Sequence, residues 1–246
     1  MTTVNVLDHG FVRLRNLAGP TRREAGFNHE TKRWIDFDAI DIDVAQVARI
    51  SFDQMDSERT YEQDMKLARY LLKHNHTSPF EMIQVWIEVA VPIFVDRQLV
   101  RHRTWRRNES SARYVVLPDK FYVPDQVGAK PKHKKQGQDS GLEENTQDWF
   151  RNSLREQCEK SYFLYETAIA SGVANEHARL FLHLNHYVHW VGNVDLSNMF
   201  KFLRERGSDG AQVEARVYAA AILKLLKPHL PGLIQIFEEE VCNGRD

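Results

Sequence analysis

The densest group of residues suited to chemistry is the segment 101–114, which reads Arg-His-Arg-Thr-Trp-Arg-Arg-Asn-Glu-Ser-Ser-Ala-Arg-Tyr. It holds five arginines, whose planar guanidinium groups match the geometry of phosphate. The hydroxyls of Ser110 and Ser111 add further donors, and Asn108 and Glu109 could hydrogen-bond a ribose or the edge of a base. The segment therefore predicts an anion site that suits a phosphorylated ligand.

Two other interpretations of the arginine-rich segment remain open. It could be a solvated basic face of a helix, or it could contact nucleic acid, because Trp105 and Tyr114 are interleaved with the arginines. The whole chain carries 33 Lys and Arg against 34 Asp and Glu, a net charge of −1. A protein that coats nucleic acid needs a surplus of basic residues. The local positive charge therefore favours a small phosphorylated ligand over a long polyanion.

Length and composition exclude several other classes of protein. The 246 residues contain two cysteines, too few for a disulfide framework or an all-cysteine zinc site. No apolar run approaches the roughly 18 residues of a membrane span, and the N-terminus lacks the pattern of a signal peptide. We expect a cytoplasmic globular protein that contacts no membrane, with residues 1–246 forming one domain.

Hydrophobic spacing predicts the elements that must position the arginine-rich segment. Alternating apolar residues predict a strand over residues 82–91, and the proline directly after it can open a helix that ends near Thr104. A capped helix is predicted over residues 61–73, after a short helix or strand at 43–52. Residues 113–123 are predicted to be a strand or an extended segment.

The second half of the chain has mostly helical patterns. Residues 127–141 are rich in Lys, Gln, Gly and Pro and predict a mobile surface loop. A long amphipathic helix is expected from Leu142 to about Ser171, where Gly172 can cap it. Further helical patterns cover residues 174–191, 195–205, 209–227 and 231–241. The chain therefore predicts an α/β (α+β) fold: a single mixed domain with a central antiparallel or mixed sheet and a helical C-terminal half.

The arginine-rich segment also carries a family motif. It resembles R-H-R-x-x-S-x-N-E-x-S-x-R-Y, the signature of the flavin-dependent thymidylate synthases. The eight matching residues are Arg101, His102, Arg103, Asn108, Glu109, Ser111, Arg113 and Tyr114. Arg106 departs from the pattern, which usually has serine at that position. So many matches at fixed spacing are far more specific than a lone glycine motif.

The resemblance extends over roughly residues 45–220, with further motifs in the expected order. They are Ala48-Arg49-Ile50-Ser51, His76-Thr77-Ser78-Pro79-Phe80-Glu81, the stretch from Pro92 to Gln98, Ala178-Arg179, Asp195 to Arg206, and Ala211-Gln212-x-Glu214. Aligning Arg206 with the catalytic arginine of the family keeps Ala211-Gln212 in frame without a gap. Choosing Arg204 would need a two-residue insertion, so Arg206 is preferred.

The resemblance implies a reaction, its cofactors and an assembly. The family converts deoxyuridine monophosphate (dUMP) to thymidine monophosphate (dTMP). The carbon comes from 5,10-methylenetetrahydrofolate, the reducing equivalents come from NADPH, and FAD carries the hydride. The resemblance also implies a homotetramer in which several subunits build each active site, with no nucleic-acid partner. The alternative is a non-catalytic module with a basic patch that binds nucleic acid.

Neither cysteine offers the nucleophile that the other type of thymidylate synthase uses. Cys158 lies in an amphipathic helical pattern and Cys242 lies near the C-terminus, and neither has an activating constellation nearby. We expect both thiols to be inert. A mechanism without a cysteine nucleophile is therefore required, and hydride transfer on a flavin supplies one.

Single residues receive roles from the resemblance. Arg206 would polarise the uracil and is the expected catalytic group. The expected dUMP contacts are Gln98, Arg101, Glu109, Ser111, Ala112, Arg113, Arg179 and Arg206. The expected FAD contacts are Ser51, Ser78, Glu81, Arg101, His102, Arg103, Glu109, Asp195, Ser197 and Lys201. Ser111 is expected to donate to a phosphate and not to act as a nucleophile.

Several positions depart from the family pattern. They are Met82, Arg106, His183, Ser197, Lys201, Glu205 and Gly210. Ser197 stands where many relatives have Arg or His, so its contact with the flavin is expected to be weaker. Lys201 replaces Asn or His, and Glu205 replaces an aliphatic residue beside the catalytic arginine.

Two further clusters could form sites. A spacing of three residues would put three histidines near one helix face, but no paired carboxylate or cysteine lies nearby, so no metal is expected. These histidines are His183, His186 and His189. A cluster of loop lysines could touch the glutamate tail of a folate, although a solvated cluster is the simpler interpretation. These lysines are Lys130, Lys132, Lys134 and Lys135.

Overall fold

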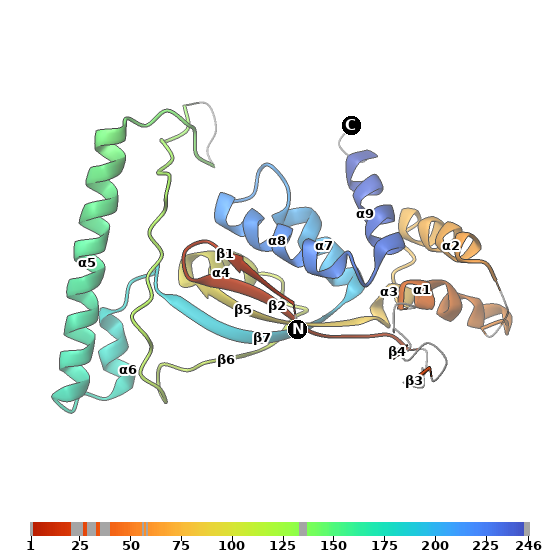
Figure 1. The fold of residues 1–246 in the computed structure, drawn as a ribbon, viewed down its shortest axis with the longest axis horizontal. Helices are drawn as coiled ribbons and strands as arrows, with labels where there is room; N and C mark the ends of the chain where they lie inside the picture. Colours follow the sequence, from red (N-terminus) through yellow and green to blue (C-terminus); the bar gives the residue numbers. More distant parts are fainter. Residues whose placement is uncertain are drawn as a thin grey trace.

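A five-stranded antiparallel sheet lies at the centre of the molecule (Figure 1). The computed structural model describes residues 2–20, 27–28, 33–34, 40–55, 57, 59–132 and 137–243. The sheet order is β1-β2-β5-β7-β6, with β1 (Thr3–Val6), β2 (Gly10–Ala18), β5 (Gln84–Pro92), β7 (Tyr187–Asp195) and β6 (Arg106–Glu109). A separate pair consists of β3 (Phe27–Asn28) and β4 (Arg33–Trp34). The expectation of an α/β fold with a central sheet is confirmed, and the sheet pairs antiparallel throughout.

Helices cover one face of the sheet because the strands turn apolar side chains to that side. In β5, Val85, Ile87 and Val89 are buried and alternate with Trp86 and Glu88, which point to the opposite face. The helices of this layer are α7 (Leu196–Arg206) and α8 (Val213–Leu226), which contact the strands, and α9 (Pro231–Asn243), α2 (Tyr61–Lys73), α1 (Ile40–Ala48), α3 (Ser78–Glu81) and the 3₁₀ turn η1 (Arg49–Phe52) beside them. One continuous apolar core joins the sheet to these helices.

Side-chain caps fix where the helices next to the site begin. Thr60 accepts a hydrogen bond from the N–H of Gln63, and the Gln63 side chain accepts one from the N–H of Thr60, a capping box that starts α2. β7 leads directly into α7, and the carboxylate of Asp195 accepts a hydrogen bond from the N–H of Asn198 at 2.9 Å. The cap therefore sets the direction in which α7 leaves the sheet.

A buried carboxylate joins α1 to α9. Asp41 is 1% exposed and accepts hydrogen bonds from the N–H groups of Gly232 at 2.8 Å and Leu233 at 2.9 Å. It also accepts a hydrogen bond from the hydroxyl of Tyr61. Asp41 thus caps α9 from another helix, and satisfies donors that the first turn of a helix leaves unpaired.

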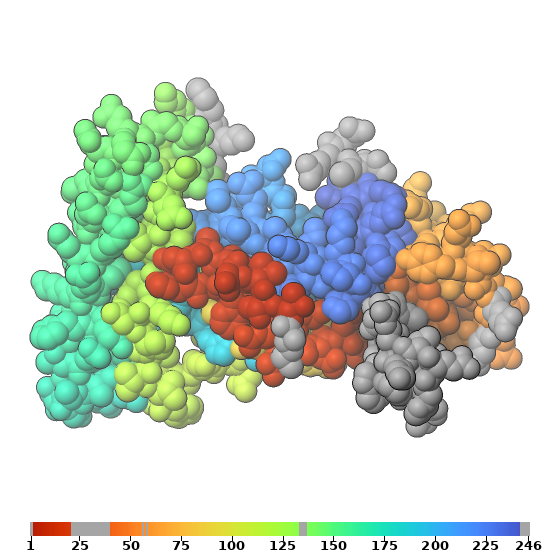
Figure 2. All heavy atoms as spheres, viewed as in Figure 1, coloured from red at the N-terminus to blue at the C-terminus, as the bar shows by residue number. Residues whose placement is uncertain are grey.

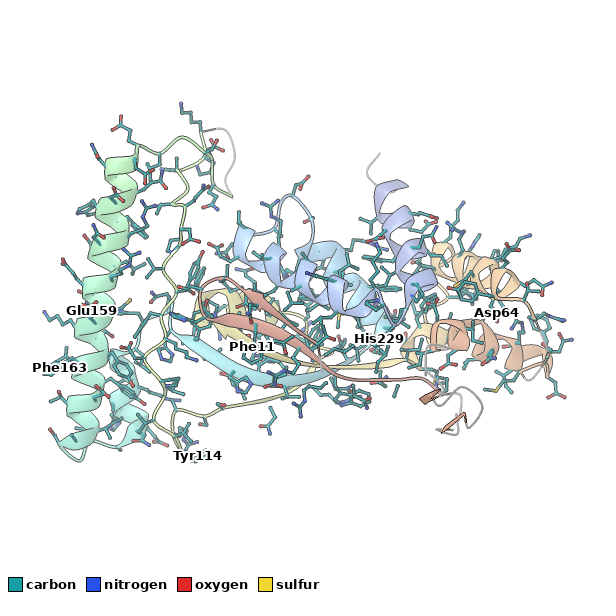
Figure 3. The ribbon with its side chains drawn as sticks, in the orientation of Figure 1. Phe11, Asp64, Tyr114, Glu159, Phe163 and His229 are labelled. Carbon is teal, nitrogen blue, oxygen red and sulfur yellow. The ribbon has the colours of Figure 1, made fainter. Side chains whose placement is uncertain are left out.

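The long helix α5 (Glu144–Ala170) lies at the opposite end of the molecule from α1 and α2 (Figure 1). It contacts α6 (Asn175–Ala178) and the 3₁₀ turn η2 (Arg179–Phe181), which follow it in the chain. The hydroxyl of Tyr165 accepts a hydrogen bond from the N–H of Leu117 at 3.0 Å and ties α5 to the segment after β6. Glu159 and Phe163 lie on the outer side of α5 in Figure 3. In Figure 2, β1 and β2 (red) form the front surface between the two ends together with α8 and α9 (blue) above them.

The second half of the chain is less helical than its pattern predicts. The prediction of a helix over residues 174–191 is wrong, because α6 is short and the chain then extends into β7. In β7, Trp190, Gly192 and Val194 are buried at every second position, so the strand alternation decides the structure. The other expected helices of this half are present at about their predicted positions.

Smaller differences occur at the ends of elements in the first half. The strand at 82–91 and the helix at 61–73 are confirmed. The helix after the strand, α4 (Ile93–Leu99), ends five residues before Thr104, and the chain then turns into β6. Residues 113–123 form no strand and pair with the chain before β7 through a single bridge between Phe121 and His186. Among the described residues no helix is long and apolar enough to cross a membrane.

Candidate active site

Arg206 and His102 meet where the end of α7 faces the turn after α4. Nε of Arg206 donates a hydrogen bond to Nε2 of His102 at 3.0 Å. The His102 ring lies 4.9 Å from the Phe202 ring, centroid to centroid, and nearly perpendicular to it. Phe202 also contacts Trp105 at 5.1 Å. Because Phe202 and Arg206 are four residues apart on one helix face, α7 fixes both contacts with His102.

His102 is the acceptor in this pair, which requires a neutral imidazole. Burial lowers the pKa of His102, the positive charge of Arg206 lowers it further, and the negative charge of Glu205 acts in the opposite direction. The neutral ring carries its proton on Nδ1 when Nε2 accepts from Arg206. The pair therefore joins a cation to a neutral base.

A hollow of about 480 Å³ opens beside this pair, between the turn after α4 and the outer face of α7. Its lining residues are Arg101, His102, Arg103, Thr104, Asn198, Lys201 and Glu205. In the described part of the chain, the side chains of Arg101, Arg103 and Lys201 make no hydrogen bond or ion pair. Three cations facing one hollow suit an anionic group such as a phosphate or pyrophosphate.

Arg107 is paired with carboxylates of the protein itself and is not part of the open anion site. Its Nη2 contacts both oxygens of Asp96, at 2.9 and 3.0 Å, and Glu109 at 3.2 Å. The guanidinium lies 4.2 Å from the Trp190 ring centroid, and the indole N–H of Trp190 donates to Asp96 at 2.9 Å. Counting Arg107 among the ligand-binding arginines of the segment is therefore wrong. Burial and the negative charge of Asp96 raise the pKa of Glu109, against the effect of Arg107.

A second group of predicted residues lies near α6. The side chain of Arg113 pairs with Glu176 at 2.5 Å, and the backbone N–H of Arg113 donates to the hydroxyl of Ser111 at 3.2 Å. Ala112 is buried between them, and Arg179 is exposed at the start of η2. Tyr114, which follows Arg113, lies in Figure 3 on the same side of the molecule as α6. Within one chain, the predicted nucleotide contacts are thus split between α6 and α7, which are well separated in Figure 1.

Comparison with known proteins agrees with this arrangement of motifs. A family model described as "Thymidylate synthase complementing protein" (Thy1) matches residues 35–232. The chain is 36% identical to the flavin-dependent thymidylate synthase of Ehrlichia ruminantium (strain Gardel), over 95% of this chain and 72% of that protein. The chain belongs to the flavin-dependent thymidylate synthase family. The expectation of an enzyme of the methyltransferase class is thereby confirmed.

Two further similarities extend over nearly the whole chain. A flavin-dependent thymidylate synthase of Thermus thermophilus is 36% identical over 98% of this chain and 80% of that protein. The crystal structure of the UMP/dUMP methylase PolB from Streptomyces cacaoi, bound with 5-Br dUMP, is similar in fold. Its TM-score is 0.78 at 25% sequence identity, over 96% of this chain and 97% of that chain.

The remaining flavin positions expected from the family lie along α3, α7 and η1. Ser78 and Glu81 are exposed on α3, which packs against α7, and Ser51 is exposed on η1. Ser197 is buried at the start of α7, 7% exposed. Both carboxylate oxygens of Asp195 bond to Asn198, so this side chain serves the helix cap. Gln98, an expected nucleotide contact, is half-buried on α4.

Several residues of the site are not identified by the sequence patterns. Asp96 and Trp190 hold Arg107, Glu176 pairs with Arg113, and Asn198 lines the hollow. The family motif includes neither Asp96 nor Glu176, and their partners are 11 and 63 residues away in the chain. For Trp190 the sequence does contain a signal, because the residues around it alternate as in a half-buried strand. The same residues also fit a helical pattern, so the signal is ambiguous.

The three histidines do not form the arrangement that their spacing suggests. His183, His186 and His189 do not share a helix, because His186 is buried just before β7 and His189 lies within β7. His189 instead hydrogen-bonds Glu88 at 2.9 Å. Among the described residues no group of three metal-ligating side chains occurs. Lys130 and Lys132 lie by a bridge between Ala129 and Asp139, whereas Lys134 and Lys135 lie outside the described residues.

Three further departures from the family pattern lie at the surface. Met82 is 54% exposed after α3, Gly210 is exposed in the turn before α8, and Arg106 donates a hydrogen bond to Asn193 at 3.1 Å. Glu205 differs from these, because its Oε2 lies 3.8 Å from Nε2 of His102. It is the departure that touches the Arg206–His102 pair directly.

Proposed function

We propose that this protein is a flavin-dependent thymidylate synthase that reductively methylates dUMP to dTMP. The carbon donor would be 5,10-methylenetetrahydrofolate, and FAD and NADPH would supply the reducing equivalents. The observation that carries the proposal is the pair of Arg206 and His102 beside a hollow lined by three cations, since an arginine next to a basic hollow suits this chemistry.

Arg206 would act on the uracil ring. In the described part of the chain its two terminal nitrogens make no hydrogen bond, because the only bond of the guanidinium is made by Nε. Terminal N–H groups aimed at a uracil carbonyl would stabilise negative charge that develops on that oxygen during the reaction. Ser111, Arg113 and Arg179 would bind the phosphate of dUMP, for which hydroxyl and guanidinium donors are well suited.

The residues around the hollow fit the phosphate part of FAD. Arg101, Arg103 and Lys201 have no partner among the described side chains and face one space, so their donors are available for a pyrophosphate. When bound, FAD would supply the hydride that reduces the transferred carbon to a methyl group. The chain's own contribution would be to orient the two substrates and to balance their charge.

The proposal includes a homotetramer with shared active sites. The residues proposed for the nucleotide phosphate lie near α6, and those for the uracil lie near α7, on separate parts of one chain (Figure 1). A site that combines α7 of one subunit with α6 of another would unite them. The open hollow and the exposed positions Ser51, Ser78 and Glu81 are what such a shared site would leave in a single chain.

No cysteine nucleophile enters the proposed mechanism. Cys158 is 4% exposed, and burial raises the pKa of its thiol, so the reactive thiolate is disfavoured. The side chain of Cys242 lies outside the described residues. That residues 1–246 form one domain and that the protein is cytoplasmic both stay predictions.

Purified protein tests the proposal directly. It should be yellow, with a flavin absorbance band near ~450 nm that dUMP perturbs, and NADPH should be oxidised faster with dUMP present. The same assay with UMP measures which of the two nucleotides this protein uses. The alternative module predicts no chromophore and a steep salt dependence of oligonucleotide binding. The pairing of Arg107 and Arg113 with acidic residues argues against that alternative, since it removes two arginines from a continuous basic surface.

A further inference from the structure

Arg206 is held at one point of its guanidinium group. Nε is bonded to His102, whereas Nη1 and Nη2 make no hydrogen bond with the described residues. An arginine side chain has many rotamers, so a fixed Nε restricts the directions in which the two terminal nitrogens can point. The bond to His102 therefore orients the part of Arg206 that would contact a substrate.

His102 is itself well fixed. Its side chain is 10% exposed, and the edge contact with Phe202 is supported by the contact between Phe202 and Trp105. Trp105 in turn lies against the buried ring of Trp190 at 5.8 Å. This row of aromatic rings connects His102 to the core, so the imidazole has little freedom to move with a ligand.

The charged groups that contact His102 or line the hollow with it come from two elements. On α7 they are Arg206, Glu205 and Lys201, and on the turn after α4 they are Arg101 and Arg103. Burial and the positive charge of Arg206 lower the pKa of His102 and favour the neutral ring, whereas Glu205 acts in the opposite direction. A protonated His102 would carry a hydrogen on Nε2 and could no longer accept the hydrogen bond from Arg206.

Glu205 is placed to take the opposite role. Its Oε2 lies 3.8 Å from the same Nε2 atom, and a protonated imidazole could donate to it after a small movement. Glu205 is 62% exposed at its side chain, so it can move. Arg206 and Glu205 thus compete for Nε2 of His102. Arg206 donates a hydrogen bond to the neutral ring, and Glu205 can accept one from the charged ring.

We propose that His102 is a positioning residue that holds Arg206 by Nε with its terminal nitrogens free for the substrate. When His102 is protonated, its Nε2 donates instead to Glu205, which moves toward the ring, and Arg206 is released. This inference rests on the proposed function, because it assumes that Arg206 contacts the nucleotide. It gives His102 a role beyond the flavin contact implied by the family. It also gives Glu205, which replaces an aliphatic residue, a role particular to this chain.

Equilibrium binding of dUMP to the flavin-loaded protein, measured between about pH 5 and pH 8, tests the proposal without turnover. In the wild type, neutral His102 holds Arg206 at neutral pH, and binding weakens as pH falls through the lowered pKa of His102. The dUMP phosphate itself titrates near pH ~6. Each variant is therefore compared with the wild type at the same pH.

Three variants separate the parts of the proposal. His102→Ala should weaken dUMP binding about tenfold at neutral pH, because Arg206 loses its support. His102→Gln, whose amide oxygen can accept from Nε without titrating, should bind dUMP nearly normally at neutral pH and show a smaller loss in acid. Glu205→Gln should shift the acid loss to lower pH, since Glu205 raises the pKa of His102. The control Asp209→Asn removes an equal charge at an exposed site, 89% exposed, and should follow the wild type.

The outcomes that overturn the proposal are distinct from failure of the proposed function. Profiles of Glu205→Gln and His102→Gln that coincide with the wild type would overturn the role of both residues. If Arg206→Ala also bound dUMP normally, the nucleotide contact of Arg206 would fail and the proposed function with it. If Arg206→Ala weakened binding and the His102 variants did not, only the positioning role would be lost.

Discussion

At the scale of single residues, Arg206 differs from Arg107 and Arg113 in what its partner leaves free. Arg107 is bound by two carboxylates and stacked on Trp190, and Arg113 is paired with Glu176. Arg206 has a neutral partner, so its full positive charge is available to a ligand. Charge that is not cancelled within the protein is what polarisation of a substrate requires.

The first prediction compares two neighbouring arginines of α7. Arg206→Ala should lower the rate of dTMP formation by at least ~100-fold, because it removes stabilisation of charge at the uracil, while flavin remains bound. Arg204→Ala is the matched control. Arg204 is exposed and does not line the hollow beside the Arg206–His102 pair, so its loss should leave turnover near that of the wild type.

Steady-state assays of dTMP formation and flavin absorbance of both variants check this prediction. Loss of turnover in Arg204→Ala, with Arg206→Ala unaffected, would mean that Arg204 and not Arg206 aligns with the catalytic arginine. Loss of flavin in Arg206→Ala would assign Arg206 to cofactor binding instead.

At the scale of elements, the edge strand β6 is held to the molecule by Arg107. β6 has four residues and pairs only with β7 in the sheet, so its ladder alone is short. The side chain of Arg107 crosses to Asp96 on α4, and both side chains are nearly buried, 13% and 11% exposed. The strand that leads into Glu109 and Ser111 is therefore fixed by a side chain as well as by its backbone.

The second prediction concerns the stability of this connection. Arg107→Ala should lower the free energy of unfolding by about 3 kcal/mol, since it leaves the buried Asp96 carboxylate without its cation. Arg106→Ala, on the opposite face of the same strand, should cost within about 0.5 kcal/mol, because that side chain is exposed. Urea unfolding at one fixed protein concentration measures both, and equal losses would contradict the structural role of Arg107.

The elements also show how far the sequence can predict this structure. The helix at 61–73 and the strand at 82–91 have clear periods and local caps, and both are present. A helix is predicted where β7 begins, because the apolar residues and histidines of this segment have a spacing that suits both a helix and a strand. The match of Arg206 to the catalytic position depends on motif spacing, whereas the contacts of Asp96 and Glu176 depend on tertiary packing that no local pattern contains.

At the scale of the whole molecule, the arrangement of the site favours cooperation between subunits. The residues near α6 and near α7 cannot meet in one chain without a large rearrangement of the sheet between them (Figure 1). Assembly would bring them together with the fold unchanged. Oligomerisation would then be a condition for activity and not only for stability.

The third prediction uses two inactive variants that lack different halves of the site. Arg206→Ala and Arg113→Ala should each be inactive alone. Co-expressed, they should form mixed oligomers with about a quarter of the wild-type activity, since a site needs one intact half from each of two subunits. The control pair, Arg113→Ala with Arg179→Ala, changes the same half and should regain nothing. Activity of the first pair no higher than that of the control would contradict shared sites.

The bond between Asp41 and the start of α9 has a consequence for synthesis on the ribosome. The partners of Asp41 lie 191 and 192 residues further along the chain, so α1 cannot complete its packing until Gly232 and Leu233 have been made. Contacts of such long range also slow folding, because a long loop must close first. Nascent chains that end before Pro231 would leave Asp41 and the part of α1 that faces α9 uncovered, and we expect them to depend on chaperones until α9 has been made.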